Sequence, residues 1–220
     1  MERKPSSTDS AQRRYPRREQ AAARTRAALV QAAAELFVQD GYLQTSVSAI
    51  AERAGVGRAT VFTSVPGGKP ELLALARDAA IAGDDEPVPV PQRPWFLHAM
   101  AATDPRELIR RQAHNYRTIQ ERAAHLEHAL VIGAADAPEL AELERTARTQ
   151  RAHGGRLVID RLVELGAVPR ARAAASADTL YAVASPDVYL LLTRDRGWTG
   201  AKYEKWLTAT LVSVLIPNAP

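Results

Sequence analysis

Residues 45–69 of the chain read TSVSAIAERAGVGRATVFTSVPGGK, and this stretch contains two short helical patterns separated by a glycine. The apolar residues of the first pattern recur at i, i+3, i+4 and i+7, on one helix face: Val47, Ile50, Ala51 and Ala54. Gly55 follows, where a helix ends in a residue that tolerates a positive φ angle. A second short helix is expected from about Gly57 to Ser64, with Val56 and Val61 facing inward. Two helices joined by a tight turn that contains glycine form a helix-turn-helix.

The outward face of the second helix carries Arg58, Thr60 and Thr63. A short exposed helix with a guanidinium and hydroxyl groups fits the major groove of DNA, where it can address base edges and phosphates. Thr45 stands where the N-cap of the first helix is expected, with its hydroxyl free to accept a hydrogen bond from the following turn. We therefore interpret this stretch as a DNA-reading element.

Composition indicates a helical globular protein with one sizeable domain or two small ones. The chain has 220 residues, of which 46% are apolar, 25% charged and only 5% aromatic, and Ala and Leu are abundant. It contains no cysteine, which excludes a disulfide framework and a thiolate metal site. There is no run of about 18 apolar residues, and the N-terminus lacks the apolar segment of a signal peptide. We expect a non-exported cytoplasmic protein that does not enter a membrane.

Positive charge is concentrated around the helix-turn-helix. Residues 1–77 contain 12 Lys or Arg against 7 Asp or Glu, a net charge of +5, whereas the other 143 residues contain 17 against 18, or −1. A phosphate backbone would meet this positive excess, so the charge distribution agrees with the motif.

Three segments resemble, in order and spacing, the N-terminal domain of the TetR (tetracycline-repressor-like) family of regulators. They cover about a fifth of the chain and read ALVQAAAELFVQDGY at 28–42, TSVSAIAERAGVGRATVF at 45–62 and KPELL at 69–73. The resemblance implies an all-α homodimeric regulator of about nine to ten helices. It would have an N-terminal three-helix DNA-binding domain and a small-molecule pocket in the C-terminal helical domain of each subunit.

The resemblance and the spacing together predict the DNA contacts. The family pattern assigns Thr45 and Lys69 to phosphates, the latter with backbone donors from the N-terminus of its helix, and Thr60 matches the family's threonine. Arg58 either reads guanine O6 and N7 or contacts a phosphate without specificity. Phe62 replaces the tyrosine that the family often has, and so loses a phosphate bond. The predicted DNA-binding residues are Thr45, Ser46, Arg58, Ala59, Thr60, Phe62, Thr63 and Lys69.

Four segments are expected along the chain. Residues 1–18 are basic and lack periodicity, so they form a disordered tail or, alternatively, an arm that follows DNA. Residues 19–82 form the DNA-binding domain. Residues 83–94, GDDEPVPVPQRP, contain four prolines and an acidic cluster, which is typical of a linker or long loop. Residues 95–217 form the helical effector-binding and dimerisation domain.

The second half of the chain contains two informative helical patterns. A long helix is expected between Pro138 and Gly166, with a kink or loosening at Gly154-Gly155. The last helix, from about Ala201 to Ile216, has an apolar stripe: Tyr203, Trp206, Leu207, Thr210, Leu211, Val214 and Leu215. Internal core is the plain interpretation of the stripe, and the resemblance implies a four-helix dimer interface. A two-fold dimer would address half-sites of a palindromic operator about 34–36 Å apart.

The chain shows no pattern for catalysis, a cofactor or a metal ion. His125 and His128 stand at i and i+3, but no HExxH motif or third ligand accompanies them. A nucleophile elbow and a dinucleotide fingerprint are also missing, so enzyme activity is unsupported. Five polar or aromatic residues could line an effector pocket, and none is assigned to it: Trp95, His98, Gln112, Tyr116 and His125.

The sequence therefore predicts a nucleoid-associated, TetR-type DNA-binding regulator. We expect a repressor that a small-molecule effector of unknown identity releases from its operator. The alternative is a dimeric DNA-binding protein that responds to no effector.

Overall fold

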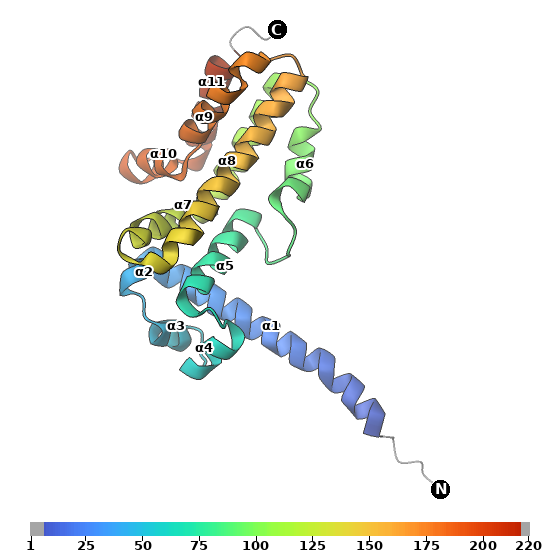
Figure 1. Ribbon diagram of the computed structural model, residues 1–220, viewed down its shortest axis with the longest axis vertical. Coiled ribbons are helices and arrows are strands. Elements are labelled where there is room, and N and C mark those ends of the chain that lie inside the picture. Colours follow the sequence, from blue (N-terminus) through green and yellow to red (C-terminus); the bar gives the residue numbers. More distant parts are fainter. Residues whose placement is uncertain (1–6, 217–220) are drawn as a thin grey trace. The chain divides into compact units, whose positions relative to one another are not determined.

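The computed structural model describes residues 7–216, with side chains described from Arg18 onward. These residues form helices α1 to α11 with short 3₁₀ and π turns and no β-strand, which confirms the all-α class (Figure 1). The chain divides into two compact units between Ala76 and Arg77. The boundary lies inside helix α5 (Gly68–Ala82), and residues 83–94 belong wholly to the second unit.

The first unit contains the helix-turn-helix and the long helix that supports it. Its helices are α1 (Ser7–Gln39), α2 (Gly41–Gln44), α3 (Val47–Arg53), α4 (Arg58–Ser64) and the first part of α5. One face of α1 is apolar and buried in the core of this unit: Leu29, Ala33, Leu36 and Phe37. The rings of Phe37 and Tyr42 lie 5.5 Å apart between centroids, and both residues are buried in this core.

Helix α1 begins earlier than the sequence indicates. It starts at Ser7 rather than near Glu19, so residues 7–18 of the expected disordered tail are helical. Four arginines in this segment have high intrinsic helix propensity, whereas Pro16 in the helix interior opposes it, so propensity alone does not explain the longer helix. Arg3 and Lys4, the first basic residues of the expected tail, lie outside the described residues.

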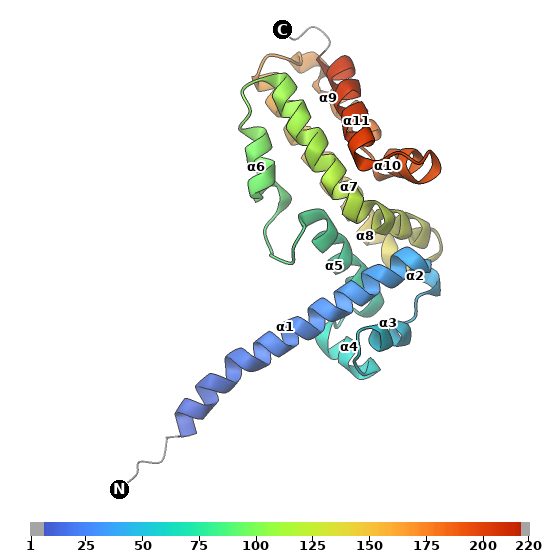
Figure 2. The same ribbon diagram turned by 180° about the vertical axis from the view of Figure 1, so that it is seen from behind.

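The second unit is a bundle around the long helix α7. Its α-helices are α6 (Pro94–Met100), α7 (Pro105–Asp136), α8 (Ala141–Glu164), α9 (Ala173–Val183), α10 (Pro186–Leu190) and α11 (Gly200–Leu215). Short turns complete it: η1 (Val90–Gln92), η2 (Pro138–Leu140), η3 (Arg170–Arg172) and the π-helical η4 (Leu191–Asp195). Both views show α6 and α11 beside α7 (Figures 1 and 2), and both helices pack against it.

The apolar stripe expected on α11 divides into a buried and a more exposed line. The buried line repeats every fourth residue: Tyr203, Leu207, Leu211 and Leu215. These side chains join one core with residues of α7 and α8, including Ile109 and Leu162. Val214 is 38% exposed, so the stripe is wider than the surface that the unit itself covers.

The end of α8 follows the sequence prediction. Gly166 has a φ angle of 73°, and its N–H donates to the carbonyl of Val163 at 3.0 Å, which terminates the helix. Helix α8 runs through Gly154-Gly155 without interruption, so the helix is not broken there, and the expected kink stays a prediction. Gly155 is buried against Leu180 of α9, where a small residue permits close packing.

The proline-rich segment 83–94 is folded around the buried side chain of Arg93. The guanidinium donates to the Asp84 carboxylate at 2.6 Å, to the Val88 carbonyl at 2.9 Å and to the Glu86 carbonyl at 2.7 Å. These bonds bring both ends of the segment together, so it forms a closed loop rather than an extended linker.

Candidate nucleic-acid interface

The turn between α3 and α4 has the geometry of a helix-turn-helix. Gly55 adopts a φ angle of 69°, as expected, and its N–H donates to the Glu52 carbonyl at 3.0 Å. The next amide, of Val56, donates to the Ala51 carbonyl at 2.9 Å, which closes the C-terminus of α3. Gly57 is the N-cap residue of α4, so the second helix begins one residue after the predicted position.

Helix α4 has one face anchored in the core and one face exposed. Val61 and Val65 are fully buried, and they fix the helix on the unit. The exposed face carries predicted contact residues, with Thr60 half-buried beside them: Arg58, Ala59, Phe62 and Thr63. Among the described residues Arg58 has no hydrogen-bond or ion-pair partner, so its five N–H donors remain for a ligand.

Thr45 does not have the position that the sequence predicts. The residue is 3% exposed, and its hydroxyl donates to the backbone carbonyls of Gly41 at 2.8 Å and Leu36 at 3.2 Å. The N-cap of α3 is its neighbour Ser46, whose Oγ accepts from the Ala49 amide at 3.0 Å. The predicted cap and phosphate contact at Thr45 are therefore wrong, because its hydroxyl is directed into the protein and joins α2 to the end of α1.

Lys69 is half-buried on the surface of Tyr42. Its ammonium donates to the Tyr42 carbonyl at 3.0 Å and lies 4.0 Å from the centroid of that ring. Both contacts fix the position of the Lys69 ammonium. A fixed ammonium can bind a phosphate as a point charge. The contact between Lys69 and DNA stays a prediction.

Two backbone donors at the N-terminus of α5 are occupied within the chain. The Gly67 amide donates to the Glu71 carboxylate at 2.7 Å, and the Gly68 amide donates to the Val65 carbonyl at 2.9 Å. Glu71 also pairs with Arg26 at 3.5 Å. A carboxylate of the chain therefore caps this helix N-terminus, and the predicted backbone contact with a phosphate beside Lys69 stays a prediction.

Two further contacts determine what the exposed face presents. Phe62 is 46% exposed, so its ring is directed largely to solvent rather than to the core. The Thr63 hydroxyl donates to the Thr60 carbonyl at 3.0 Å, which leaves its methyl group and oxygen lone pairs at the surface. Sequence reasoning missed one supporting ion pair, Arg53 of α3 with Glu35 of α1 at 2.9 Å, because the partners are 18 positions apart.

The residues considered for an effector pocket separate into two groups. Trp95 and His98 line an open groove beside α7, and Gln112 and Tyr116 lie on its core side. His125 is exposed elsewhere on α7, and partial burial, Arg194 and His128 lower its pKa. The described part of the chain contains no cluster of three or more His, Asp or Glu residues that could hold a metal ion. No helix within residues 7–216 is long and apolar enough to cross a membrane.

Two short helices joined by a glycine turn, the second with one buried and one exposed face, have the geometry of a helix-turn-helix. Residues 29–74 match the family model described as bacterial regulatory proteins, tetR family. These residues are therefore a TetR-family DNA-binding domain, and the chain has the fold of TetR-family transcriptional regulators. Such regulators are generally transcription factors and not enzymes.

Solved structures with this fold extend over both units. A putative TetR-family regulator from Rhodococcus sp. is 16% identical, with 88% of this chain and 99% of that chain covered and a TM-score of 0.64. SmeT, in a complex with triclosan, is 17% identical, with 88% and 92% covered and a TM-score of 0.63. The TetR-family regulator PfmR from Thermus thermophilus is 22% identical, with 85% and 93% covered and a TM-score of 0.57. No curated protein sequence matches the chain.

Proposed function

We propose that the protein is a homodimeric, sequence-specific repressor that acts in the cytoplasm on nucleoid DNA and that a small-molecule effector releases from a palindromic operator. The observation that carries this proposal is the exposed face of α4, where Arg58 is unpartnered among the described residues and Val61 anchors the helix from behind. One such helix makes too few contacts for tight specific binding, so two copies are needed, one for each half-site.

The DNA-facing residues in this proposal form a revised set. Arg58 contacts base edges, Thr60, Phe62 and Thr63 contact sugar, phosphate or thymine methyl groups, and Lys69 contacts a phosphate. Ser46 and Ala59 lie on the exposed surface beside them, and Thr45 is omitted because it is buried. We assign no catalytic residue.

Effector control would act through a shift between two packings of the helical unit. A ligand that binds one packing better changes the spacing of the two recognition helices, which then no longer fit successive grooves. A coupling free energy of about 1–3 kcal/mol is sufficient for such release. Two observations support an effector: the groove beside α7 in this chain, and the bound triclosan of SmeT, a protein with the same fold. A chain that binds its operator equally with and without every effector would instead be a constitutive DNA-binding protein.

The test begins with selection of duplexes from a random pool by the full chain. We expect a palindrome with half-sites separated by about one helical turn. Arg58→Ala should then weaken operator binding by about 1–3 kcal/mol and relax preference at one base position, while Lys69→Ala weakens all sequences alike. Arg156→Ala, on the exposed surface of α8, is the matched control and should change neither. A loss for Arg58→Ala that is equal on operator and random DNA contradicts the base-reading role.

A further inference from the structure

Helix α7 has a polar face that the core does not use. This face forms an open groove with a volume of about 540 Å³, bounded by α6, by Ala82 at the end of α5 and by the α7 residues from Glu107 to Arg122. The groove residues on α7 recur at helical spacing, opposite the buried Leu108 and Ile109. The volume lies in the range of sites for small organic molecules. We call this site the α6–α7 groove.

The α6–α7 groove contains more positive than negative charge. Among the lining residues, Arg110, Arg111 and Arg122 carry positive charge and Glu107 carries a carboxylate. Glu204 and Asp84, outside the lining, interact electrostatically with Arg110 and Arg122 respectively. Glu107 accepts from Arg110 at 2.6 and 2.7 Å and from Arg111 at 2.6 Å, and these bonds lower its pKa to about 2. Glu107 therefore stays ionised and balances one of the three guanidiniums, which leaves a net charge of +2 from the arginines and Glu107.

Arg122 is held in the groove by neutral acceptors only. Its guanidinium donates to the carbonyls of Ala80 at 2.8 Å and Ile81 at 3.1 Å, in the last turn of α5. A Cβ atom at Gly83 would lie 2.9 Å from this guanidinium, so glycine at that position provides the room. The described carboxylates include no ion-pair partner of Arg122. The Arg122 guanidinium is fixed in position, and the Asp84 carboxylate, which is paired with Arg93, interacts with it electrostatically at longer range.

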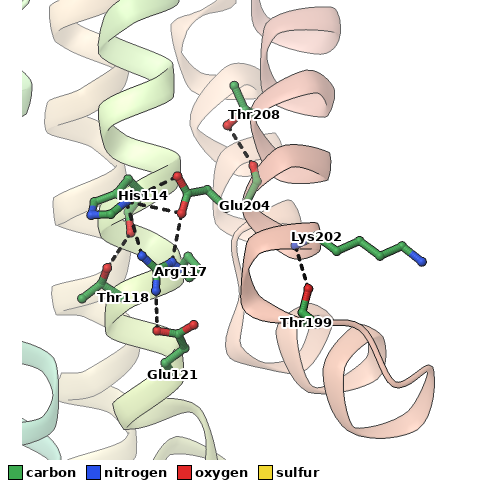
Figure 3. Close-up of polar contacts among 8 residues, drawn as sticks. All are labelled: His114, Arg117, Thr118, Glu121, Thr199, Lys202, Glu204 and Thr208. Carbon is green, nitrogen blue, oxygen red and sulfur yellow. Dashed lines mark hydrogen bonds and ion pairs between the residues drawn. The ribbon is translucent and has the colours of Figure 1, made fainter.

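The neighbouring cation-rich patch on α7 is neutralised by contrast. Figure 3 shows Glu204 of α11 bonded to His114 and Arg117, and Arg117 also bonded to Glu121. His114, which also lines the groove, lies 3.3 Å from the Glu204 carboxylate. The excess charge is therefore concentrated on the three arginines.

The α6–α7 groove also offers apolar surface. Trp95 and Ile119 are half-buried in its lining, and they flank the polar side chains of Asn115 and Thr118. An indole ring and an aliphatic side chain bind the flat or flexible body of an organic molecule, while guanidinium groups bind its carboxylate through charge-assisted pairs.

We propose that the α6–α7 groove binds amphipathic organic carboxylates, with the carboxylate at Arg110, Arg111 and Arg122 and the apolar body on Trp95 and Ile119. This inference names the effector class of the proposed regulator, and its regulatory meaning rests on that function. The carboxylate competes with the carbonyls of Ala80 and Ile81 for Arg122. Ligand binding therefore loosens the bonds that hold the last turn of α5 to α7.

The test measures binding by calorimetry with the full chain and no DNA. The probes are sodium 2-naphthoate and decanoate, with 2-naphthamide as the neutral match of the first and inorganic phosphate as a bare anion. We expect naphthoate and decanoate to bind, and naphthamide and phosphate to bind at least about tenfold more weakly. The proposal is overturned if no carboxylate binds, or if either comparison probe binds as tightly as naphthoate.

Variants locate the site. Arg122→Gln and Arg110→Gln should each weaken naphthoate binding about tenfold, and Arg122→Lys should keep part of the affinity because it keeps the charge. Arg110 has a 63% exposed side chain, so its variant tests the groove even if Arg122→Gln does not fold. Arg156→Gln, in an exposed pair on α8, is the control. Unchanged affinity in Arg110→Gln and in every folded Arg122 variant overturns the site.

The same samples separate this inference from the proposed function. Selected duplex is titrated with the wild-type chain in the presence and absence of naphthoate. If the chain binds naphthoate but no duplex, the proposed regulator function is refuted and the proposed carboxylate site in the groove stands. A chain that binds duplex but no carboxylate refutes the groove and keeps the DNA-binding function.

Discussion

Arg58 in the first unit and two buried arginines in the second unit serve opposite purposes. On α4 of the first unit, Arg58 is exposed and unpartnered among the described residues. In the second unit Arg77 and Arg93 have side chains that are only 4% exposed, and carboxylates and other acceptors occupy their donors. A satisfied guanidinium connects parts of the protein, whereas an exposed one retains its donors for a ligand. The hydrogen-bond and ion-pair partners of an arginine, and not its local sequence or charge, distinguish an arginine that connects parts of the protein from one that is open to a ligand.

Arg77 shows the connecting use most clearly. Its Nε donates to the Glu127 carboxylate of α7, and its Nη1 donates to Gln150 of α8 at 3.2 Å and to Asp78 at 3.0 Å. One side chain thus joins the C-terminal part of α5 to two other helices of the second unit. The compact units divide immediately before this residue, and the side-chain partners of Arg77 all lie in the second unit.

Loss of Arg77 is the largest effect that we predict from this comparison. Arg77→Ala leaves Glu127, whose side chain is 14% exposed, without its buried partner, and should destabilise the protein by about 3–5 kcal/mol. Urea unfolding measures this change. Arg58→Ala is the matched variant and should alter the free energy of unfolding by no more than about 0.5 kcal/mol. Equal losses in the two variants would remove the distinction between connecting and unpartnered arginines.

A double variant sharpens the interpretation of Arg77. The double variant Arg77→Met with Glu127→Met also removes the Glu127 carboxylate, which Arg77→Ala leaves buried without its partner. The double variant should therefore recover most of the free energy of unfolding that Arg77→Ala loses. If the double variant is as unstable as Arg77→Ala, then lost packing around the Arg77 side chain accounts for the loss of stability, and the ion pair with Glu127 does not.

Local patterns predict the helices and their glycine ends, but they do not predict the partners of polar side chains. The helix-turn-helix, Gly55, Gly166 and α11 were all visible because each depends on residues a few positions apart. Thr45 and Ser46 are adjacent hydroxyl residues and suit an N-cap equally. The choice between them depends on the carbonyls of Leu36 and Gly41, which tertiary structure brings to Thr45.

The α6–α7 groove could not be predicted from the sequence for the same reason. Trp95 and His98 were among the candidates for an effector pocket, but the arginines of α7 were not. Their significance comes from the position of the last turn of α5, whose carbonyls hold Arg122 without neutralising it. No spacing in the sequence encodes that contact, since the partners are about 40 positions apart.

The two adjacent hydroxyls allow the next prediction, a smaller one. Ser46→Ala should cost about 1 kcal/mol through loss of the α3 cap, and Thr45→Val should cost about 1 kcal/mol through loss of its buried hydrogen bonds. Operator affinity, measured where both variants are fully folded, should stay unchanged for Thr45→Val. A specific loss of DNA affinity in Thr45→Val would restore Thr45 to the interface and contradict its connecting use.

Glu107 should make the free energy of unfolding depend on pH under acid conditions. Bonds from Arg110 and Arg111 lower its pKa from 4.5 to about 2 in the folded state. A lowered folded pKa means that the carboxylate stabilises the fold above about pH 4.5 and loses this contribution as the pH falls toward 2. In Glu107→Gln the free energy of unfolding should therefore depend less steeply on pH across this interval. An unchanged slope would show that Arg110 and Arg111 do not hold the carboxylate in solution.

Tyr203 is the opposite case to Arg58, because its polar group lies without a partner inside the core rather than on the surface. Its hydroxyl is buried and has no hydrogen-bond partner among the described residues, while its ring meets Tyr189 edge to face at 4.9 Å. A buried unsatisfied hydroxyl costs free energy, so Tyr203→Phe should leave the packing intact and stabilise the protein by up to about 1 kcal/mol.

Thermal and urea unfolding measure the small gain expected for Tyr203→Phe. Leu207→Ala, one turn further along the same buried line of α11, is the packing control and should cost about 2–5 kcal/mol. A clear loss of stability in Tyr203→Phe would mean that the hydroxyl has a partner in solution.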